Sequence, residues 1–197
     1  IEASVGRTQR VVTVLRLLKE EVRFTRMEPL GLAQSVQAAL GQNSHLLRHG
    51  LDVETVLDPA VQTLAEPDEL GQVWTNLILN AVQAMGHQGR LRVEVVQEGP
   101  HAVARFTDSG PGMQPDVLSR AFEPFFTTRH DQAGSGLGLY LCRRVVEQHG
   151  GSIEITASTP GATTVEVRLP LFAIDPHNET LLPSGNVEAG AEPAQAR

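Results

Sequence analysis

The segment Asn76-Leu-Ile-Leu-Asn80-Ala81 places two amide side chains inside a helix that apolar periodicity predicts over residues 67–85. Residues four apart lie on the same face of a helix, so the two amides share a face beside an otherwise apolar surface. Pro67, followed by two acidic residues, is typical of a helix start. Considered alone, the pair either ties down a neighbouring loop or offers oxygen atoms to a hard cation such as Mg2+.

Three further segments follow this helix. Asp108–Met113 (DSGPGM) ends a predicted strand and is either a plain turn or a carboxylate beside glycines that let a purine ring approach. Phe122–Arg129 (FEPFFTTR) puts three of the chain's six Phe in a loop, where they form a small core or cover something else. Gly134–Leu139 (GSGLGL) opens a helix whose free N–H groups suit phosphates, although it has neither Rossmann nor Walker A spacing.

The remaining periodicity gives an α+β order of elements. Hairpins mixed with helices predict helices covering one face of a mixed, mostly antiparallel sheet. From about residue 173 the periodicity is lost, and we expect a disordered tail. The predicted elements are helices over 7–27, 31–48, 67–85, 115–121 and 136–149, and strands over 51–57, 91–96, 102–107, 152–157 and 163–169.

Composition limits the function classes. The 197 residues carry a formal net charge of −7, so no general binding to nucleic acid is expected. The hydrophobic fraction of 41% excludes wholesale disorder, and the single cysteine fits a reducing, cytoplasmic compartment. No apolar run approaches the ~20 residues of a membrane span. Because the chain starts at Ile1, we expect a fragment, attached to a membrane only through upstream segments.

Together and in this order, the four segments resemble the N, G1, F and G2 boxes of the ATP-binding domain of bacterial sensor histidine kinases. The resemblance covers about residues 30–171 and implies the Bergerat fold, a two-layer α/β sandwich preceded by a dimerisation helix. It divides the chain into the second helix of a dimerisation hairpin (1–28), an ATP-binding catalytic domain (29–172) and the tail (173–197). It also implies transfer of the ATP γ-phosphate to a His, with relay to an Asp of a response-regulator receiver domain.

The resemblance gives roles to single positions. Asn80 is the implied Mg2+ ligand, with Asn76 supporting it or a phosphate. Asp108 is the implied acceptor for the adenine N6 amine, and Thr163 or Thr164 reaches this pair from the last hairpin. The Phe segment would anchor a mobile lid. The complete set expected to hold ATP or ADP is Asn76, Asn80, Asp108, Gly110, Gly112, Met113, Phe126, Thr128, Arg129, Gly134, Ser135, Gly136, Leu137, Gly138 and Thr163.

Asn76 also bears on the type of reaction. Relatives that hydrolyse ATP have a glutamate base where this helix has Asn76, so the resemblance favours transfer to a protein nucleophile over hydrolysis. Many relatives have a lysine and an aromatic or His residue where this chain has Gln83 and Ala84. Because Lys19 is the only lysine and lies far away in the chain, we predict that Arg129 supplies the positive charge, which makes Asn76, Asn80 and Arg129 the expected catalytic residues.

The phosphoacceptor is missing from this stretch of sequence. Residues 1–28 contain no His, so the acceptor helix is expected upstream, and this chain alone is not expected to autophosphorylate. The full protein would form a homodimer through the helical hairpin. Two alternatives remain, an anti-sigma-type serine kinase and a degenerate nucleotide-binding scaffold of the same fold. The leading helix and the FEPFFTTR segment disfavour the first, and the Asn, Asp and Gly positions disfavour the second.

Overall fold

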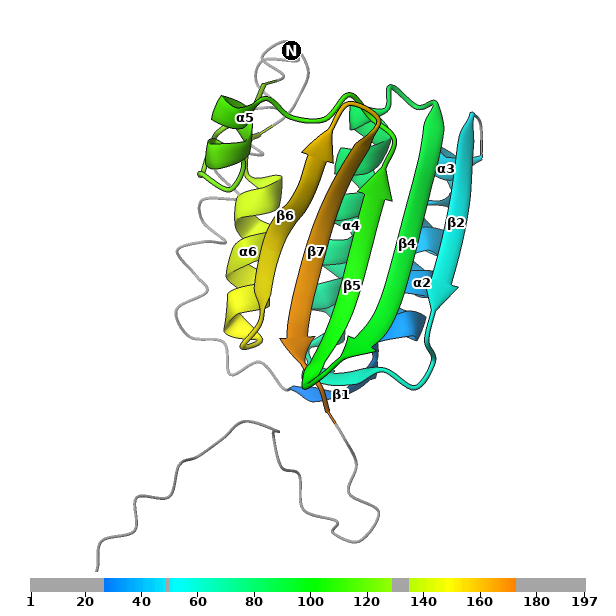
Figure 1. Cartoon of the computed structure of the whole chain (residues 1–197). Helices are drawn as coiled ribbons and strands as arrows, with labels where there is room; N and C mark the ends of the chain where they lie inside the picture. Colours follow the sequence, from blue (N-terminus) through cyan, green and yellow to red (C-terminus); the bar gives the residue numbers. More distant parts are fainter. Residues whose placement is uncertain (1–26, 49, 129–134, 173–197) are drawn as a thin grey trace, which may run out of the picture.

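Five strands form one sheet in the order β2-β4-β5-β7-β6 in a computed structural model of the chain, which describes residues 27–48, 50–128 and 135–172 (Figure 1). Strands β2 and β4 are parallel, and the other neighbours are antiparallel. The prediction of a mixed, mostly antiparallel sheet is therefore confirmed. The strands are β2 (Leu51–Leu57), β4 (Gly89–Glu98), β5 (His101–Asp108), β6 (Ser152–Thr159) and β7 (Ala162–Pro170).

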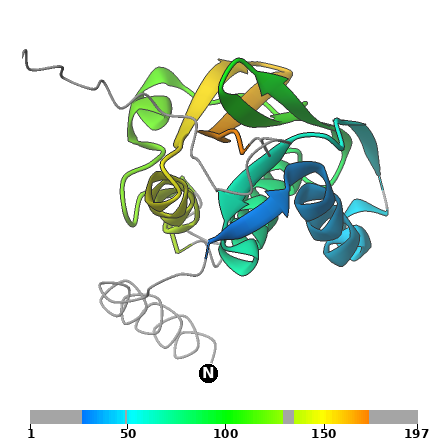
Figure 2. The same ribbon diagram turned by 90° about the horizontal axis from the view of Figure 1, so that it is seen from below.

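Three helices cover one face of this sheet. Figure 2, which views the molecule from below, shows α2 (Leu32–Gln42), α4 (Pro67–Ala84) and α6 (Gly138–Gln148) on the same side of the strands. Within the described ranges, no helix lies over the opposite face. Two short helices, α3 (Ser44–Leu47) and α5 (Pro115–Arg120), complete the helical elements of these ranges. The α+β sandwich expected from the sequence is the observed fold.

Some expectations concern residues outside the described ranges. The predicted helix over 7–27, Arg129, Gly134 and the tail from residue 173 belong to this group. Among the helices that the structure does describe, none combines the length and the apolar character needed to cross a lipid bilayer.

Helix α4 begins where the sequence predicts, because its first turn is capped and contains proline. The Glu66 carboxylate accepts hydrogen bonds from the backbone N–H groups of Asp68 (3.3 Å) and Glu69 (2.6 Å). Pro67 occupies the first turn, where a missing N–H costs nothing. The apolar stripe of α4, which includes Trp74, is buried against the sheet and the other helices. Capping and burial together place this helix at the centre of the helical layer.

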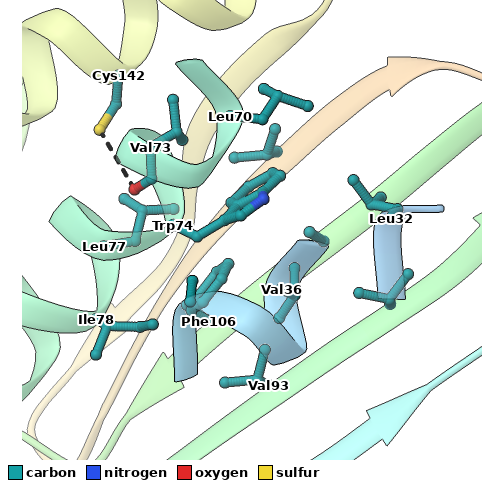
Figure 3. Packing of buried hydrophobic residues seen from close by; sticks show 14 of the residues in the cluster. Leu32, Val36, Leu70, Val73, Trp74, Leu77, Ile78, Val93, Phe106 and Cys142 are labelled. Carbon is teal, nitrogen blue, oxygen red and sulfur yellow. Dashed lines mark hydrogen bonds between the residues drawn. The ribbon is translucent and has the colours of Figure 1, made fainter. Parts of the chain in front are cut away.

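The core connects α4 to the central strand β5 (Figure 3). The rings of Trp74 and Phe106 stack with centroids 5.8 Å apart and an interplanar angle of 18°. The indole N–H of Trp74 donates to Ser35 Oγ at 2.9 Å, so the buried ring leaves no polar atom unsatisfied. Phe106 lies two residues before the end of β5 at Asp108. The core therefore fixes the strand end from which the candidate site is built.

The structure differs from the sequence prediction in two places. The helix predicted over 31–48 is interrupted at Asn43, whose buried amide donates to the Ala39 carbonyl at 2.8 Å and to Thr75 Oγ1 at 3.4 Å. A side chain that bonds the backbone in this way competes with helix continuation. In addition, β1 (Glu28–Gly31) and β3 (Gln62–Ala65) form an antiparallel pair that the sequence analysis did not predict.

Candidate functional site

A buried carboxylate ends the central strand. Asp108 is only 6% exposed, and its Oδ1 accepts a hydrogen bond from the Gly110 N–H at 2.8 Å. Burial raises the pKa of this carboxyl above its ordinary value, and the hydrogen bond from Gly110 offsets part of that effect. A buried carboxylate of this kind is a strong hydrogen-bond acceptor for a ligand N–H group that reaches it in place of water.

The strand register selects one of two neighbouring threonines. Thr163 on β7 lies opposite Asp108 and is 3% exposed. Thr164 lies opposite Thr107, and the two hydroxyl oxygens are 3.0 Å apart. Because successive side chains of a strand point to opposite faces, Thr164 belongs to the open face of the sheet. Of the two threonines that the sequence left open, Thr163 is the one beside the carboxylate.

Glycine is required at two positions after Asp108. A Cβ atom at Gly110 would lie 2.6 Å from Asp108 Oδ1 and 3.4 Å from Ala84 at the end of α4. Gly112 has φ +78°, and a Cβ atom there would lie 2.7 Å from the Thr159 carbonyl oxygen. The segment therefore packs closely between the end of α4 and the β6–β7 turn, as a surface for a flat ring requires.

Asn80 and the start of α6 face each other. A Cβ atom at Gly138 would lie 3.9 Å from Asn80 Nδ2, so the glycine leaves space between the amide and the first turn of α6. Among the described residues, none is hydrogen-bonded to the Asn80 side chain. The backbone N–H groups of that first turn have no intrahelical partner, which makes the helix start suitable for anions. The amide and the helix start thus border the same space.

Asn76, one turn before Asn80, lies beside Cys142 of α6. Burial raises the pKa of the Cys142 thiol to about 12, and a hydrogen bond with Asn76 opposes this rise. The Cys142 thiol also donates to the Val73 carbonyl oxygen, at an S···O distance of 3.8 Å. Figure 3 draws this contact as a dashed line. Asn76 therefore links α4 to α6, and its side chain is an amide rather than a carboxylate.

The phenylalanine segment packs against the glycine-rich segment. Gly136 has φ +67°, and a Cβ atom there would lie 2.5 Å from the Phe125 carbonyl carbon. Phe125 itself has φ 65°, and its ring is 55% exposed, whereas Phe126 is half-buried beneath the guanidinium of Arg120 at 4.3 Å. Arg143 of α6 lies 4.1 Å over the Phe122 ring. These contacts attach the segment to α5 and α6.

Three other predicted residues lie around the start of α6 and the end of the phenylalanine segment. Leu137 is buried, and its N–H donates to Ser135 Oγ at 3.3 Å. Ser135 and Thr128 are exposed, so both are accessible to a ligand. Arg129 and Gly134, between them, are outside the described ranges.

A cavity of about 520 Å³ reaches Asp108 from the open side of the sheet. Its other walls are exposed charged residues of β2 and β4, such as Arg90 and Arg92, and its described lining does not include Asn80 or Gly138. Because Asp108 alternates with the open-face Thr107, its side chain points to the helix-covered face, and this cavity reaches only the strand end. On the helix-covered side, the described residues form one group around Asp108 and another around Asn80. The second group lies next to the undescribed residues 129–134.

The described residues fit a magnesium ion held mainly by other ligands. No cluster of three or more His, Cys, Asp or Glu side chains occurs among them. Mg2+ prefers oxygen ligands, keeps several water molecules, and is commonly held by one or two protein groups together with phosphates. Asn80, whose amide faces the start of α6, can supply one such oxygen.

The sequence analysis did not assign Ser158 and Gly161 to this site. The Met113 N–H donates to Ser158 Oγ at 2.7 Å, and the Gly161 N–H donates to the Gly110 carbonyl at 2.9 Å. The Pro160-Gly161 turn was visible in the sequence, but nothing local indicated that it contacts the segment after Asp108.

Comparison with known proteins identifies one family. The profile described as "Histidine kinase-, DNA gyrase B-, and HSP90-like ATPase" matches residues 65–173. The sensor histidine kinase ZraS of Salmonella typhimurium is 42% identical over 110 residues, which are 55% of this chain and 23% of ZraS. The sensory histidine kinase/phosphatase NtrB of Rhodobacter capsulatus is 30% identical in an alignment 188 residues long that covers 85% of this chain and 51% of NtrB. The chain thus spans about a quarter to a half of these relatives.

A solved structure supports the same grouping. The mycobacterial sensor histidine kinase MprB superposes with a TM-score of 0.65 and 30% sequence identity, covering 74% of this chain and 97% of the MprB chain.

Proposed function

The chain belongs to the histidine kinase-, DNA gyrase B- and HSP90-like ATPase family, and from this premise we propose that it is the ATP-binding kinase domain of a sensor histidine kinase. In the proposed reaction the bond between the γ-phosphorus and the bridging oxygen of ATP breaks. A bond from that phosphorus to an imidazole nitrogen forms, and ADP leaves. The phosphoryl group then passes to an Asp of a response-regulator receiver domain.

The observation that carries the proposal is the arrangement of Asp108. A carboxylate buried between Gly110 and Thr163, at the end of the central strand, is suited to accept the N6 amine of adenine. Gly110, Gly112 and Met113 then provide the backbone surface for the ring. Carboxylate recognition of an amine selects adenine over guanine, which presents a carbonyl oxygen at the corresponding position.

The phosphates are proposed to lie between Asn80 and the start of α6. The backbone N–H groups of Ser135, Gly136 and Gly138, together with Gly134, would bind phosphate oxygens, and the Leu137 N–H would do so by leaving Ser135 Oγ. Asn80 would contribute an oxygen ligand to Mg2+. The ion supplies charge neutralisation at the phosphates. Arg129 is proposed to add positive charge, and Phe126 and Thr128 to border the ligand.

Asn76 supports transfer over hydrolysis. An amide does not deprotonate water, and the position is filled by Asn76 in contact with Cys142. With no base at this point, the domain acts by positioning the γ-phosphate and by neutralising its charge, so the reaction depends on a supplied nucleophile. We place that nucleophile on a helical hairpin to which residues 1–28 contribute, in a homodimer whose kinase domains (residues 29–172) are cytoplasmic.

Calorimetric titration of the 197-residue chain with ADP, with and without Mg2+, tests nucleotide binding. We expect Mg2+-dependent binding that is weakened at least tenfold by Asp108→Asn and by Asn80→Asp. Arg92→Ala, on the open face of the sheet, is the matched control and leaves binding unchanged. Equal binding by the wild type and both site variants would refute the site assignment.

A transfer assay tests the kinase activity. The chain is mixed with radiolabelled ATP and a separately produced acceptor hairpin of a related kinase. We expect no label on the chain itself and an acid-labile, alkali-stable label on the hairpin, as a phosphohistidine gives. An acid-stable label on a serine would instead support an anti-sigma-type serine kinase, and binding without transfer in the full-length protein would support a nucleotide-binding scaffold.

A further inference from the structure

Strand β6 contains one extra residue near the candidate site. Ile153 pairs with Val167 and Ile155 pairs with Val165, but the next pair joins Ala157 to Thr164. Thr156 is therefore unpaired, and the register shifts there as in a β-bulge. Bulges next to functional sites commonly change the direction in which the following side chains point.

This bulge changes which side chain of β6 faces the helices. Ile153 belongs to the core, and Ile155 pairs with Val165, which packs against the core, so regular alternation would next turn Ala157 inward. The extra residue instead pairs Ser158 with Thr163, and paired residues of neighbouring strands point to the same face. Thr163 is in turn paired with Asp108. The bulge thus places the Ser158 hydroxyl on the face that carries the buried carboxylate.

The Ser158 hydroxyl holds the segment that follows Asp108. Ser158 Oγ accepts the Met113 N–H at 2.7 Å. The same segment is held by the hydrogen bond from the Gly161 N–H to the Gly110 carbonyl, and by the close approach of Gly112 to Thr159. Among these three contacts, only that of Ser158 uses a side chain. The β6–β7 turn lies at the upper end of these two strands in Figure 1.

We propose that Ser158 is a positioning residue for adenine, which fixes the distance of the Gly110–Met113 backbone from the Asp108 carboxylate. This inference rests on the proposed function, because it assigns to Ser158 an effect on the base end of the same site. Without the hydroxyl, the Met113 N–H turns to water and the segment loses its side-chain attachment to β6. The Gly110–Met113 backbone, against which the adenine ring would lie, is then no longer held at a fixed distance from the Asp108 carboxylate.

Three variants separate this role from a general effect on stability. Ser158→Ala removes the hydroxyl, and Ser158→Thr keeps it on the same backbone. Ser152→Ala removes an exposed hydroxyl from the first residue of the same strand and is the control. Affinities are measured on the 197-residue chain by displacement of a fluorescent ADP derivative, at a temperature where melting curves show every variant folded. The competing ligands are adenosine and ADP.

We expect Ser158→Ala to weaken adenosine and ADP by the same factor, about tenfold, as the loss of one well-placed hydrogen bond gives. Ser158→Thr is expected to restore both affinities, and Ser152→Ala to leave them unchanged. The inference is overturned when the folded Ser158→Ala chain binds both ligands as the wild type does. It is also overturned when only ADP is weakened, or when Ser158→Thr does not restore binding.

These outcomes are distinct from failure of the proposed function. When the wild-type chain binds ADP and Asp108→Asn abolishes binding, the function stands whatever Ser158→Ala does. When the wild-type chain binds no adenine ligand, both the function and the role of Ser158 are rejected.

Discussion

Asp108 and Thr163 stand directly opposite each other on β5 and β7, and both side chains are buried although neither is apolar. Among the described residues, the carboxylate of Asp108 has one hydrogen bond, from the Gly110 N–H. Burial of an ionised group without a charged partner costs folding free energy. The central strand therefore ends in a residue that stability alone would not favour.

Asp108→Asn is expected to remove nucleotide binding without destabilising the free chain. Because burial raises the pKa of this carboxyl in the folded state, ionisation at pH 7 opposes folding, and that cost disappears in the amide. We expect the melting temperature without ligand to stay equal or rise, and the increase caused by ADP to vanish. The difference in ligand-free melting temperature between Asp108→Asn and the wild type should shrink as the pH falls below the raised pKa, because the Asp108 carboxyl is then protonated in the folded chain.

The exposed Asp116 of α5 supplies the control for this experiment. Asp116→Asn removes the same charge from the chain but leaves the ADP-induced increase intact. A large drop in the ligand-free melting temperature of Asp108→Asn, absent from the Asp116 variant, would contradict the account of the buried carboxylate.

Two helical glycines are expected to respond differently to alanine. A methyl group at Gly138 makes an ordinary 3.9 Å contact with Asn80 Nδ2 and fills the space assigned to the phosphates. We expect Gly138→Ala to fold normally but to bind Mg2+-ADP at least tenfold more weakly, with adenosine unaffected. Gly71→Ala, inside α4 and with no atom within 4 Å of its Cβ, should leave binding unchanged and stabilise the chain by about 0.5–1 kcal/mol.

Calorimetric titrations of the two glycine variants with ADP and adenosine, and urea unfolding curves, provide the measurements. Equal ADP affinity in the Gly138 variant and the wild type rejects the assignment of phosphates to the start of α6. An equal loss of affinity for adenosine and for ADP in the Gly138 variant also rejects this assignment.

The aromatic stack in the core is expected to dominate stability. Phe106→Ala removes a buried ring from Trp74 and should cost about 3–5 kcal/mol of unfolding free energy. Phe125→Ala removes the ring of a residue that is 55% exposed and should change stability by less than about 0.5 kcal/mol. Fluorescence of Trp74, the chain's only tryptophan, follows both unfolding transitions. Similar losses in the two variants would show that the stack is not the central contact.

A ring of alternating charges covers part of the open sheet face. Arg105 bonds Glu98 at 2.5 Å and Glu166 at 2.6 Å, and Arg168 bonds the same two carboxylates at 2.8 and 2.6 Å. Val103 lies opposite Arg168 on the neighbouring strand and is fully buried on this face. Hydrogen bonding to Arg105, and then to Arg168, lowers the pKa of Glu98.

The lowered pKa of Glu98 predicts a loss of stability in acid. A carboxyl with a lowered folded-state pKa contributes stability above its unfolded pKa of about 4.3, and that contribution is lost as the pH falls through the folded value. We expect the urea midpoint of the wild type to fall between pH 5 and pH 3 by more than that of Glu98→Gln. The exposed Glu154 gives the control, because Glu154→Gln should follow the wild type. Parallel curves for the wild type and Glu98→Gln would exclude the effect.

The sequence was sufficient for elements whose signals are local. The 3.6-residue period and Pro67 predicted α4, and alternation predicted β2 with its observed bounds. The β1–β3 pair was missed because two four-residue strands more than thirty residues apart carry no local pattern of their own. The interruption at Asn43 was missed because its amide is held partly by Thr75, which belongs to another helix.

The candidate site shows the same division. Asp108 and Gly110 were identified because their segment keeps a fixed place among four motifs. The choice between Thr163 and Thr164, and the role of Ser158, depended on strand register. A one-residue shift reverses the direction of every side chain, and the bulge at Thr156 is not visible in the sequence pattern.

The central position of β5 has a consequence for local opening. Backbone amides of a strand flanked on both sides, by β4 and β7, exchange with solvent only through near-global unfolding. The first turn of α6 lies at a helix end, where partial opening costs less free energy. Hydrogen exchange should therefore be slow in β5, which ends at the proposed adenine acceptor Asp108, and faster at the start of α6, where the phosphates are proposed to lie. The triphosphate end can then be released while the base remains held.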